Sequence, residues 1–323
     1  MHDSYQRRID YLRLSITDRC NLRCVYCRPP EELPFLPHEA ILSYEEILRL
    51  ARIALDLGLS KIRLTGGEPL VRREVVYLCR QLMRLAGLES LTLTTNGVLL
   101  APLAEELYRA GIKRLNISLD TLNPQRYAQI TGRDYFQRVW EGIAAAQEVG
   151  FAPIKINVVL LAGLNDDEIE ALAGLTYRYP FHVRFIELMP TDFGMGSGLS
   201  CAEVLARLAR LDTLVPTQSA RSNGPARHYR FPRGQGKIGL ISPLSQHFCA
   251  SCNRLRLTAD GRLFTCLFAE EGLDLKALLC QGAPDAAISE AIRRAVWQKP
   301  REAPLRPTLS RKCLPRPMAA MGG

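Results

Sequence analysis

Short β-rich segments alternate with amphipathic helical segments through residues 1–190 of this 323-residue sequence. Runs of β-branched and other apolar residues predict strands at Tyr11–Thr17, Lys61–Thr65, Leu91–Thr95, Arg114–Ser118, Ile154–Leu160 and Val183–Ile186. Apolar residues at three- and four-residue spacing predict helices at Ser43–Leu57, Arg73–Leu85, Ala101–Ala110, Phe136–Val149 and Asp166–Tyr179. Because a crossover helix separates successive strands, the strands are expected to run parallel, as in an α/β fold.

Polar residues follow five of the predicted strands at the point where each strand ends. They form the stretches Thr17–Cys20, Thr65–Glu68, Thr94–Asn96, Ser118–Asp120 and Glu187–Met189. In parallel sheets and barrels the carboxyl ends of the strands meet at one edge, and ligands bind there. The sequence therefore predicts that one face of the fold carries the chemistry.

The pattern changes after Pro190, which indicates two regions, residues 1–190 and residues 191–323. The second region begins with a Gly-rich stretch, continues with a predicted helix near Ala202–Leu211 and then becomes rich in Arg, Pro and Gly. Residues 299–323 are rich in Pro and basic residues, a composition that by itself is typical of a disordered tail.

Composition argues against a membrane or exported protein. The sequence has no apolar run of about eighteen residues, and residues 1–10 are polar, without the apolar core of an export signal. A cytoplasmic protein is therefore expected. The formal net charge of +9 is distributed along the chain, so it fits an anionic small substrate as well as nucleic acid.

Six of the ten cysteines lie at close spacings in two groups. In a long chain without an export signal, such groups indicate metal ligands in a reducing compartment rather than disulfides. The other four are scattered, and they are expected to be small buried side chains or unreactive surface thiols. These four are Cys79, Cys201, Cys280 and Cys313.

The first group, Cys20, Cys24 and Cys27, has the spacing CxxxCxxC and comes directly after the first predicted strand. Three soft thiolates in one short loop suit an iron–sulfur cluster, in which one iron is then left without a protein ligand. A closed zinc site needs four ligands, and the nearest histidine, His38, lies well beyond the loop. Zinc, or three unrelated cysteines, is the alternative interpretation.

The second group is Cys249, Cys252 and Cys266. A zinc site completed by His247 is an open alternative here, because Cys and His both suit zinc. Arg254 and Arg256 follow this group, and in an extended strand they point to the same side. Two guanidiniums beside an open metal position suit a phosphate-bearing ligand, although solvated surface arginines are the simpler alternative.

The first cysteine group, with Tyr26 before its last cysteine, resembles the signature of the radical S-adenosylmethionine (SAM) superfamily. In that superfamily three cysteines hold a [4Fe–4S] cluster whose fourth iron binds the amino and carboxylate groups of SAM. Gly66-Gly67-Glu68-Pro69, at the end of the second predicted strand, resembles the superfamily's GGEP motif. The two glycines let the backbone approach a ligand closely, and Glu68 can accept a hydrogen bond from the methionine ammonium.

Several ordered stretches resemble one family within this superfamily, the GTP 3′,8-cyclases, also called molybdenum cofactor biosynthesis protein A. They are Tyr11–Asp18, Lys61–Pro69, Thr94–Gly97, Arg184–Met189, Phe248–Arg256 and Gly322-Gly323. The resemblance implies a partial (βα)6 TIM-like barrel with the first cluster at its mouth. It also implies a C-terminal region that carries a second [4Fe–4S] cluster at the other end of the cavity.

The same resemblance implies roles for individual residues. The metal ligands are Cys20, Cys24, Cys27, Cys249, Cys252 and Cys266. The residues that contact SAM are Tyr26, Gly66, Gly67, Glu68, Ser118 and Met189. The residues that contact GTP are Arg13, Lys61, Arg63, Thr94, Lys155, Arg184, Arg254 and Arg256. Catalytic roles fall to Arg254, Arg256, Gly322 and Gly323, because the diglycine tail reaches into the active site in this family.

The Arg and Lys residues among these contacts fit a nucleoside triphosphate. Arg and Lys bind phosphates by charge-assisted hydrogen bonds, and a lone charge within an apolar strand is unfavourable without an anion. Lys61, Arg63 and Lys155 each lie in such a strand. Without the motif context, Arg13 and Arg63 would be read as ordinary arginines of an edge strand.

The implied reaction is that of a lyase. A 5′-deoxyadenosyl radical derived from SAM abstracts hydrogen from C3′ of GTP, which cyclises onto C8 to give (8S)-3′,8-cyclo-7,8-dihydro-GTP, the first step of molybdenum cofactor biosynthesis. Its partners would be an external one-electron reductant and, downstream, cyclic pyranopterin monophosphate synthase, and the protein would form a homodimer.

Two other functions are compatible with parts of the sequence. A twin-cluster radical SAM enzyme acting on a peptide would share the cysteine groups, but such enzymes often use more cysteines. A nucleic-acid module stapled by zinc or iron–sulfur would use the positive charge, but only 7% of residues are aromatic and no alternation of basic and aromatic residues is present. No nucleic-acid partner and no membrane partner is therefore expected.

Overall fold

The computed structural model describes residues 1–27, 34–189, 198–217, 224–303 and 321. Within them, twelve strands form one sheet in the order β12-β11-β10-β1-β2-β3-β4-β5-β6-β9-β8-β7. The strands are β1 (Tyr11–Ser15), β2 (Lys61–Thr65), β3 (Ser90–Thr95), β4 (Leu115–Ser118), β5 (Ile154–Leu160), β6 (His182–Glu187), β7 (Val215–Thr217), β8 (Arg227–Arg230), β9 (Lys237–Ile241), β10 (Arg254–Leu257), β11 (Arg262–Phe264) and β12 (Leu273–Asp274).

The six strands predicted from the sequence are present as β1 to β6, and each pairs in parallel with the next. Two further parallel strands extend this group. β10 pairs with the free side of β1, and β9 pairs with the free side of β6. Residues on both sides of position 190 therefore build one continuous sheet, and the antiparallel strands β11–β12 and β8–β7 finish its two edges.

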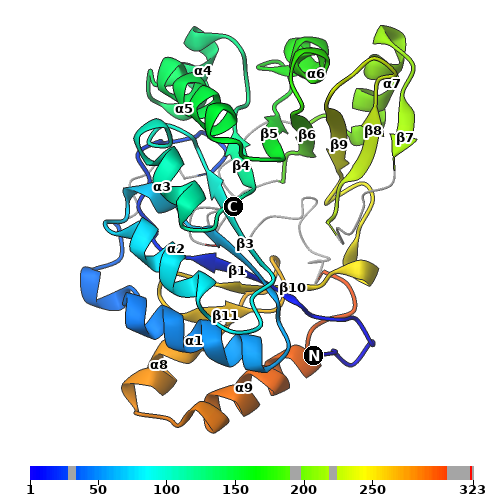
Figure 1. Ribbon diagram of the computed structural model, residues 1–323. Coiled ribbons are helices and arrows are strands. Elements are labelled where there is room, and N and C mark those ends of the chain that lie inside the picture. Colours follow the sequence, from blue (N-terminus) through cyan, green and yellow to red (C-terminus); the bar gives the residue numbers. More distant parts are fainter. Residues whose placement is uncertain (28–33, 190–197, 218–223, 304–320, 322–323) are drawn as a thin grey trace.

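Helices cover the outside of the sheet, as Figure 1 shows for α1 to α6. The helices in the described residues are α1 (Tyr44–Asp56), α2 (Val75–Met83), α3 (Ala104–Arg109), α4 (Pro124–Thr131), α5 (Phe136–Val149), α6 (Ile169–Arg178), α7 (Cys201–Leu211), α8 (Leu275–Cys280) and α9 (Asp285–Trp297). Every helix predicted above is present, with ends that differ by a few residues. The prediction missed α8 and α9, and it missed α4, which begins with Pro124 after the N-cap Asn123 and ends at Thr131, before the C-cap Gly132.

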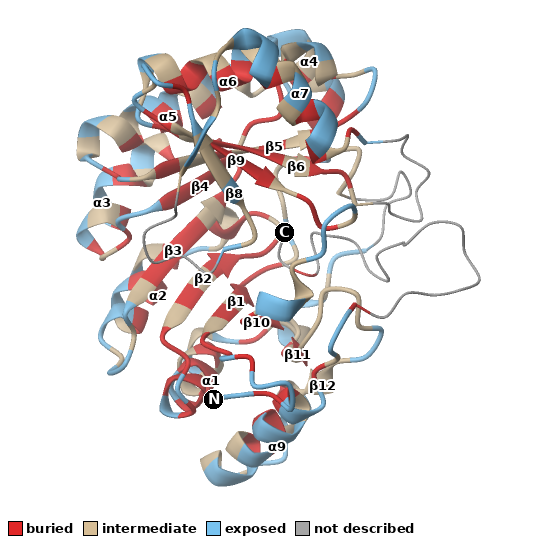
Figure 2. Cartoon of the chain, turned by 90° about the vertical axis from the view of Figure 1, so that its right-hand side faces the viewer, coloured by how far each residue is buried: buried red, intermediate tan, exposed pale blue. Residues whose placement is uncertain are grey.

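Apolar and polar residues alternate along the parallel strands. In β1 and β2 the buried residues Leu12, Leu14, Ile62 and Leu64 belong to the hydrophobic core. Alternate residues of a strand point to opposite faces, so the intervening polar positions face the inside of the curved sheet. Figure 2 shows the buried residues running along the strands and the inner sides of the helices.

The sheet has two separate edge strands, β12 and β7, so the barrel is partial, as expected. The predicted α/β fold is confirmed. Two of the scattered cysteines, Cys79 and Cys201, are buried in the core, whereas Cys280 is exposed and Cys313 lies outside the described residues. Across the described ranges, no helix is both long enough and apolar enough to span a membrane.

Candidate functional site

A cavity of about 450 Å³ lies on the inner face of the sheet and is lined by residues of all eight parallel strands. Every site residue predicted from the sequence that the structure describes lines this cavity. They are Arg13, Cys20, Cys24, Tyr26, Cys27, Lys61, Arg63, Gly66, Gly67, Glu68, Thr94, Ser118, Lys155, Arg184, Met189, Cys249, Cys252, Arg254, Arg256 and Cys266. Gly322 and Gly323 lie outside the described residues.

The first cysteine loop follows β1 and rests on the glycine turn that follows β2. Gly67 N donates to Thr17 O at 2.8 Å, and Glu68 N donates to Arg19 O, also at 2.8 Å. A Cβ atom on Gly67 would lie 2.3 Å from Arg19 O, and one on Gly66 would lie 2.5 Å from Thr17 O. The glycines are therefore required by the close approach of the cysteine loop itself, a reason that the motif alone did not reveal.

Glu68 is 1% exposed and accepts three hydrogen bonds from this end of the barrel. The donors are Asn96 N at 2.6 Å, Thr95 Oγ1 at 2.7 Å and Leu70 N at 3.0 Å. Burial raises the pKa of Glu68 to about 7 against the lowering effect of these bonds. Glu68 thus holds the end of β3 against the glycine turn, in addition to lining the cavity.

Asn96 connects this arrangement to the first cysteine group. Its Nδ2 lies 3.8 Å from Cys20 Sγ and 2.7 Å from Asn21 Oδ1, in donor geometry toward both. Its backbone amide is the one that donates to Glu68. Sequence analysis noted Asn96 as a polar residue at a strand end but gave it no role in the site.

The half-buried Tyr26 pairs with the buried Asp120 beside the same cysteines. Tyr26 donates from its hydroxyl to Asp120 Oδ2 at 2.6 Å, and Val159 N donates to Asp120 Oδ1 at 2.8 Å. Burial raises the pKa of Asp120 to about 6. Burial also raises the pKa of Cys24 well above its ordinary value, and the nearby Cys27, Asp120 and Cys20 raise it further.

This donor set fits an iron–sulfur cluster. Three thiolates in a partly buried loop beside a carboxyl repel one another. Bound iron offsets this repulsion, because a coordinated thiol is deprotonated and shares its negative charge with the metal. Among the described residues, no three His, Cys, Asp or Glu side chains are grouped closely enough to hold a single ion. A cluster places its own iron and sulfide between the thiolates, so its ligands need not converge on one point.

The second cysteine group lies at the opposite end of the strands. Cys249 and Cys252 precede β10, and Cys266 follows the antiparallel β11, whereas the first group follows the parallel β1. The five residues of β1 span roughly 16 Å, which separates the two groups and leaves the cavity between them. Burial alone would raise the pKa of Cys252, but Lys299, the backbone amide of Arg254 and the nearby guanidiniums outweigh it and lower the pKa.

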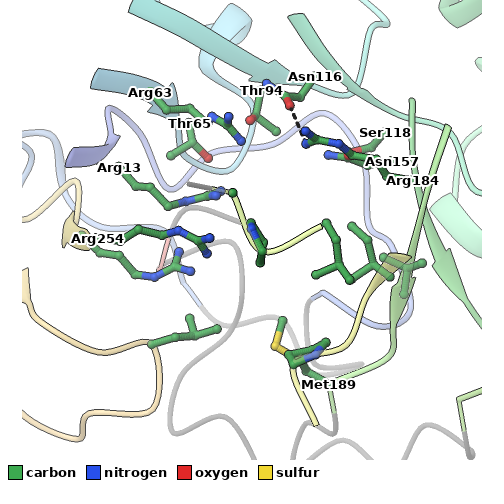
Figure 3. Close-up of a pocket in the computed structure, with 18 of the residues that line it drawn as sticks. Arg13, Arg63, Thr65, Thr94, Asn116, Ser118, Asn157, Arg184, Met189 and Arg254 are labelled. Carbon is green, nitrogen blue, oxygen red and sulfur yellow. Dashed lines mark hydrogen bonds between the residues drawn. The ribbon is translucent and has the colours of Figure 1, made fainter. Parts of the chain in front are cut away.

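Cationic side chains line the middle of the cavity. Strand register explains their gathering: Arg13 of β1 lies opposite Arg63 of β2 on one side and Arg256 of β10 on the other. Figure 3 shows Arg13 and Arg254 extending into the cavity from one side and Arg184 from the opposite side. Burial and then neighbouring arginines lower the pKa of Arg184 to about 9 and that of Arg256 to about 10.

Lys155 shows the effect of this excess positive charge most clearly. Burial, and then the nearby Arg184, Arg63 and Arg114, together lower its pKa to about 7. A cavity that repels its own ammonium groups in this way is suited to a polyanion, because a bound phosphate would offset the repulsion.

The expectation that Lys61 is a lone charge within an apolar strand is wrong. Its Nζ lies 2.8 Å from Asp10 Oδ2, so Lys61 is not a lone charge awaiting an anion. Asp10 is 3% exposed and its other oxygen accepts from Asn253 Nδ2 at 2.6 Å. A carboxylate 51 residues away in the sequence could not be paired with Lys61 from spacing alone.

Neutral polar residues complete the wall; Thr94 was predicted, whereas Asn116 and Asn157 were not. Arg184 Nη1 donates to Asn116 Oδ1 at 3.3 Å, as drawn in Figure 3. Among the described residues, the buried atoms Arg184 Nε, Thr94 Oγ1 and Asn157 Oδ1 have no hydrogen-bond partner. Buried polar atoms are normally paired, so these three are suited to hydrogen bonds with a ligand. The available signal was the alternation of Asn116 and Asn157 with apolar residues along β4 and β5.

Comparison with known proteins identifies the family of this chain. The model of the radical SAM superfamily matches residues 14–176, and the Molybdenum Cofactor Synthesis C model matches residues 181–305. The chain is 50% identical over 305 residues to a protein of Moorella thermoacetica named GTP 3′,8-cyclase, covering 94% of each chain. A Thermodesulfovibrio yellowstonii protein of the same name is 44% identical over 329 residues, covering 100% of each chain.

Solved structures support the fold. SuiB of Streptococcus suis, crystallised with S-adenosylmethionine, superposes with a TM-score of 0.62 at 16% identity, covering 89% of this chain and 68% of SuiB. At that identity the likeness concerns the fold alone. The two family models and the extent of identity together decide the assignment: the chain belongs to the GTP 3′,8-cyclase family of the radical SAM superfamily.

Proposed function

We propose that this protein is a GTP 3′,8-cyclase that catalyses the first step of molybdenum cofactor biosynthesis. The observation that carries the proposal is the cationic cavity between two separate cysteine groups, in a chain whose relatives bear that enzyme name. The excess of Arg and Lys in the cavity favours a nucleoside triphosphate over a peptide as substrate.

The cofactors are a [4Fe–4S] cluster with SAM at one end of the cavity and a second [4Fe–4S] cluster at the other. Cys20, Cys24 and Cys27 would hold the first cluster, and Cys249, Cys252 and Cys266 the second. When bound, the first cluster and SAM supply a 5′-deoxyadenosyl radical. The SAM contacts would come from Tyr26, Gly66, Gly67, Glu68, Ser118 and Met189.

The protein's own residues have mainly to bind and orient GTP. Arg13, Arg63, Lys155 and Arg184 line the cavity and would bind GTP from several directions, with Thr94 and Lys61 also in its wall. Fixing the substrate in this way places C3′ of the ribose at one reproducible position, from which cyclisation onto C8 proceeds. The walls of the partial barrel would limit the access of water to the reacting atoms.

Arg254 and Arg256 are proposed to act at the end of the cavity near the second cysteine group, together with Gly322 and Gly323. Their guanidiniums would contact the nucleotide there. Residues 1–190 would thus supply the radical chemistry and residues 191–323 the second cluster and the remaining substrate contacts. An external one-electron reductant, a homodimer, a cytoplasmic location and a downstream cyclic pyranopterin monophosphate synthase stay predictions.

An anaerobic assay tests the proposal. Reconstituted protein is incubated with SAM, dithionite and GTP, and 5′-deoxyadenosine and a cyclised GTP product are followed by mass spectrometry. Both are expected to form, and only when GTP is present. SAM cleavage with unchanged GTP would overturn the assignment of substrate.

Matched arginine variants make this assay specific. Arg184→Met removes a charge from the cavity wall and should reduce GTP conversion at least tenfold, while SAM binding is kept. Arg80→Met removes an exposed arginine that pairs with Glu106 on the surface at 3.3 Å, and it should leave conversion unchanged.

A further inference from the structure

Lys299 lies buried against the second cysteine group, in a segment whose composition is typical of a disordered tail. Lys299 is only 3% exposed. Its Nζ donates to Arg254 O at 3.1 Å, to Thr265 O, and to the side chain of Cys252. An ammonium carries three donors and a neutral amine only two, so three acceptors around one nitrogen fit the charged form.

The two carbonyl acceptors of Lys299 lie next to cysteines of the second group in the sequence. Arg254 follows Cys252 by two residues, and Thr265 directly precedes Cys266. Lys299 therefore joins the two arms of the chain that carry the cysteines of this group, and its charge interacts with both Cys252 and Cys266. The spacing of the cysteines in the sequence did not indicate this contact.

Arg7 anchors the segment that carries Lys299. Arg7 Nη1 donates to Cys249 O at 2.8 Å and to Arg301 O at 3.0 Å, and Nη2 donates to Pro300 O at 2.7 Å. Asp3, fully buried, pairs with Arg7 Nε at 2.5 Å and balances its charge. Arg7, near the start of the chain, thus hydrogen-bonds both to the segment after α9 and to the loop of Cys249. Figure 1 shows the N-terminal segment next to the segment that follows α9.

We propose that Lys299 is a positioning residue of the second iron–sulfur cluster, which holds the ligand-bearing arms together and raises the reduction potential of the cluster through its positive charge. The inference rests on the proposed function, because it requires the second cluster. The role is distinct from that of Arg254 and Arg256, since the ammonium of Lys299 points at cysteines and carbonyls of the protein.

A fixed cation beside a cluster favours the reduced state, which carries one more negative charge than the oxidised state. Burial strengthens this effect, because little water lies between the charges. Removing the charge should therefore make the cluster harder to reduce. Removing the hydrogen bonds should separate the two arms and weaken retention of the cluster.

Three substitutions separate these effects. Lys299→Met removes both the charge and the hydrogen bonds. Lys299→Gln removes the charge but keeps an amide with two donors, so it also serves if Lys299→Met does not fold. Lys299→Arg keeps the charge. The matched control is Lys276→Met, since Lys276 Nζ likewise donates to two backbone carbonyls, Glu39 O and Ile41 O, the latter at 3.1 Å, away from the cysteines.

The experiment measures the reduction potential and the iron and sulfide content of the second cluster. It uses full-length protein in which Cys20, Cys24 and Cys27 are replaced by Ala, so that one cluster signal is followed. Lys299→Gln and Lys299→Met should shift the reduction equilibrium at least tenfold, which is about 59 mV lower for one electron. Lys299→Arg should stay within about threefold of the parent, and Lys276→Met should equal it.

Lys299→Met should in addition lose iron to a chelator faster than Lys299→Gln does. Parent-like potentials in both neutral variants would overturn the inference, and so would an equal shift in Lys276→Met. Failure of the parent protein to bind any cluster would instead refute the second cluster of the proposed function. The two failures are therefore distinguishable.

Discussion

Arg256 donates a hydrogen bond from Nη1 to the backbone carbonyl of Met321, 3.3 Å away. Both residues are buried, Met321 at 2% exposure and Arg256 at 8%. Residue 321 therefore contacts an arginine that lines the cavity and that we assign to substrate binding. The two residues that follow it are glycines, which add little bulk and tolerate many backbone conformations.

Deletion of Gly322 and Gly323 tests the proposed catalytic role of the two C-terminal glycines. It should reduce the GTP-dependent product at least tenfold, about 1.4 kcal/mol in the activation barrier, because the tail is assigned to catalysis. SAM affinity and the unfolding midpoint should not change. Full activity of the truncated protein would refute a role for the diglycine, and replacing both residues by Ala shows whether small size is required.

Gly67→Ala should damage the first cluster site. The added Cβ would lie 2.3 Å from Arg19 O, a backbone atom that cannot move without displacing the loop that leads to Cys20. We expect iron content to fall by about half after reconstitution, since one of two clusters is affected. Gly174→Ala, in α6 with no atom within 4 Å of its Cβ, is the control and should keep full iron content. Equal iron in the two variants would contradict the account.

Lys155 should make GTP binding depend on pH. Its pKa is about 7 in the free protein, lowered by burial and then by Arg184, Arg63 and Arg114, and bound phosphates favour the ammonium, so the pKa rises on binding. Affinity should thus be greatest below pH 7 and should decline between the free and bound pKa values. Because the pKa lies below the unfolded value of 10.5, this group's contribution to the free energy of unfolding rises with pH between about 7 and 10.5.

Calorimetry in buffers of different ionisation enthalpy measures this proton uptake. The wild type should take up more protons at pH 8 than Lys155→Met does, and Lys155→Met should bind GTP more weakly with a flatter pH profile. The titration of GTP itself is common to both proteins and cancels in the comparison. Identical proton uptake in the two proteins would refute the role of Lys155.

Tyr26→Phe should destabilise the protein by about 1–3 kcal/mol, because it removes a hydrogen-bond donor from the buried Asp120 carboxyl. Tyr177→Phe is the matched control. Tyr177 donates to Asp212 at the same distance, 2.6 Å, but Asp212 is partly exposed and water can replace the donor. Chemical unfolding under anaerobic conditions should show a smaller loss, below about 1 kcal/mol, for the control. A larger loss in Tyr177→Phe would contradict this explanation.

Much of the fold could be predicted from the sequence because its signals are local. The six parallel strands and their helices follow from hydrophobic periodicity, and the capping box of Ser43 and Glu46 marks the start of α1. Helix α4 escaped prediction because its eight residues contain few apolar positions, although Asn123, Pro124 and Gly132 were signals of its ends.

The residues of the candidate site were predictable for a similar reason. Cys20, Cys24 and Cys27 form a motif within eight residues, and the glycine turn and Arg254 with Arg256 are equally compact. In addition, the carboxyl ends of parallel strands meet at one edge whatever the loops contain, so short motifs at those ends were certain to converge.

The sequence by itself predicted the candidate cluster ligands, and it determined the alternation that turns polar side chains inward and the direction of the six central strands. Only the tertiary structure decided that β9 and β10 border those strands, that Glu68 holds Asn96, that Asp10 pairs with Lys61, and that Lys299 joins the arms of the second cysteine group. The physical reason is range: periodicity and spacing fix the geometry of neighbours along the chain, whereas these partners are brought together by packing of the whole sheet.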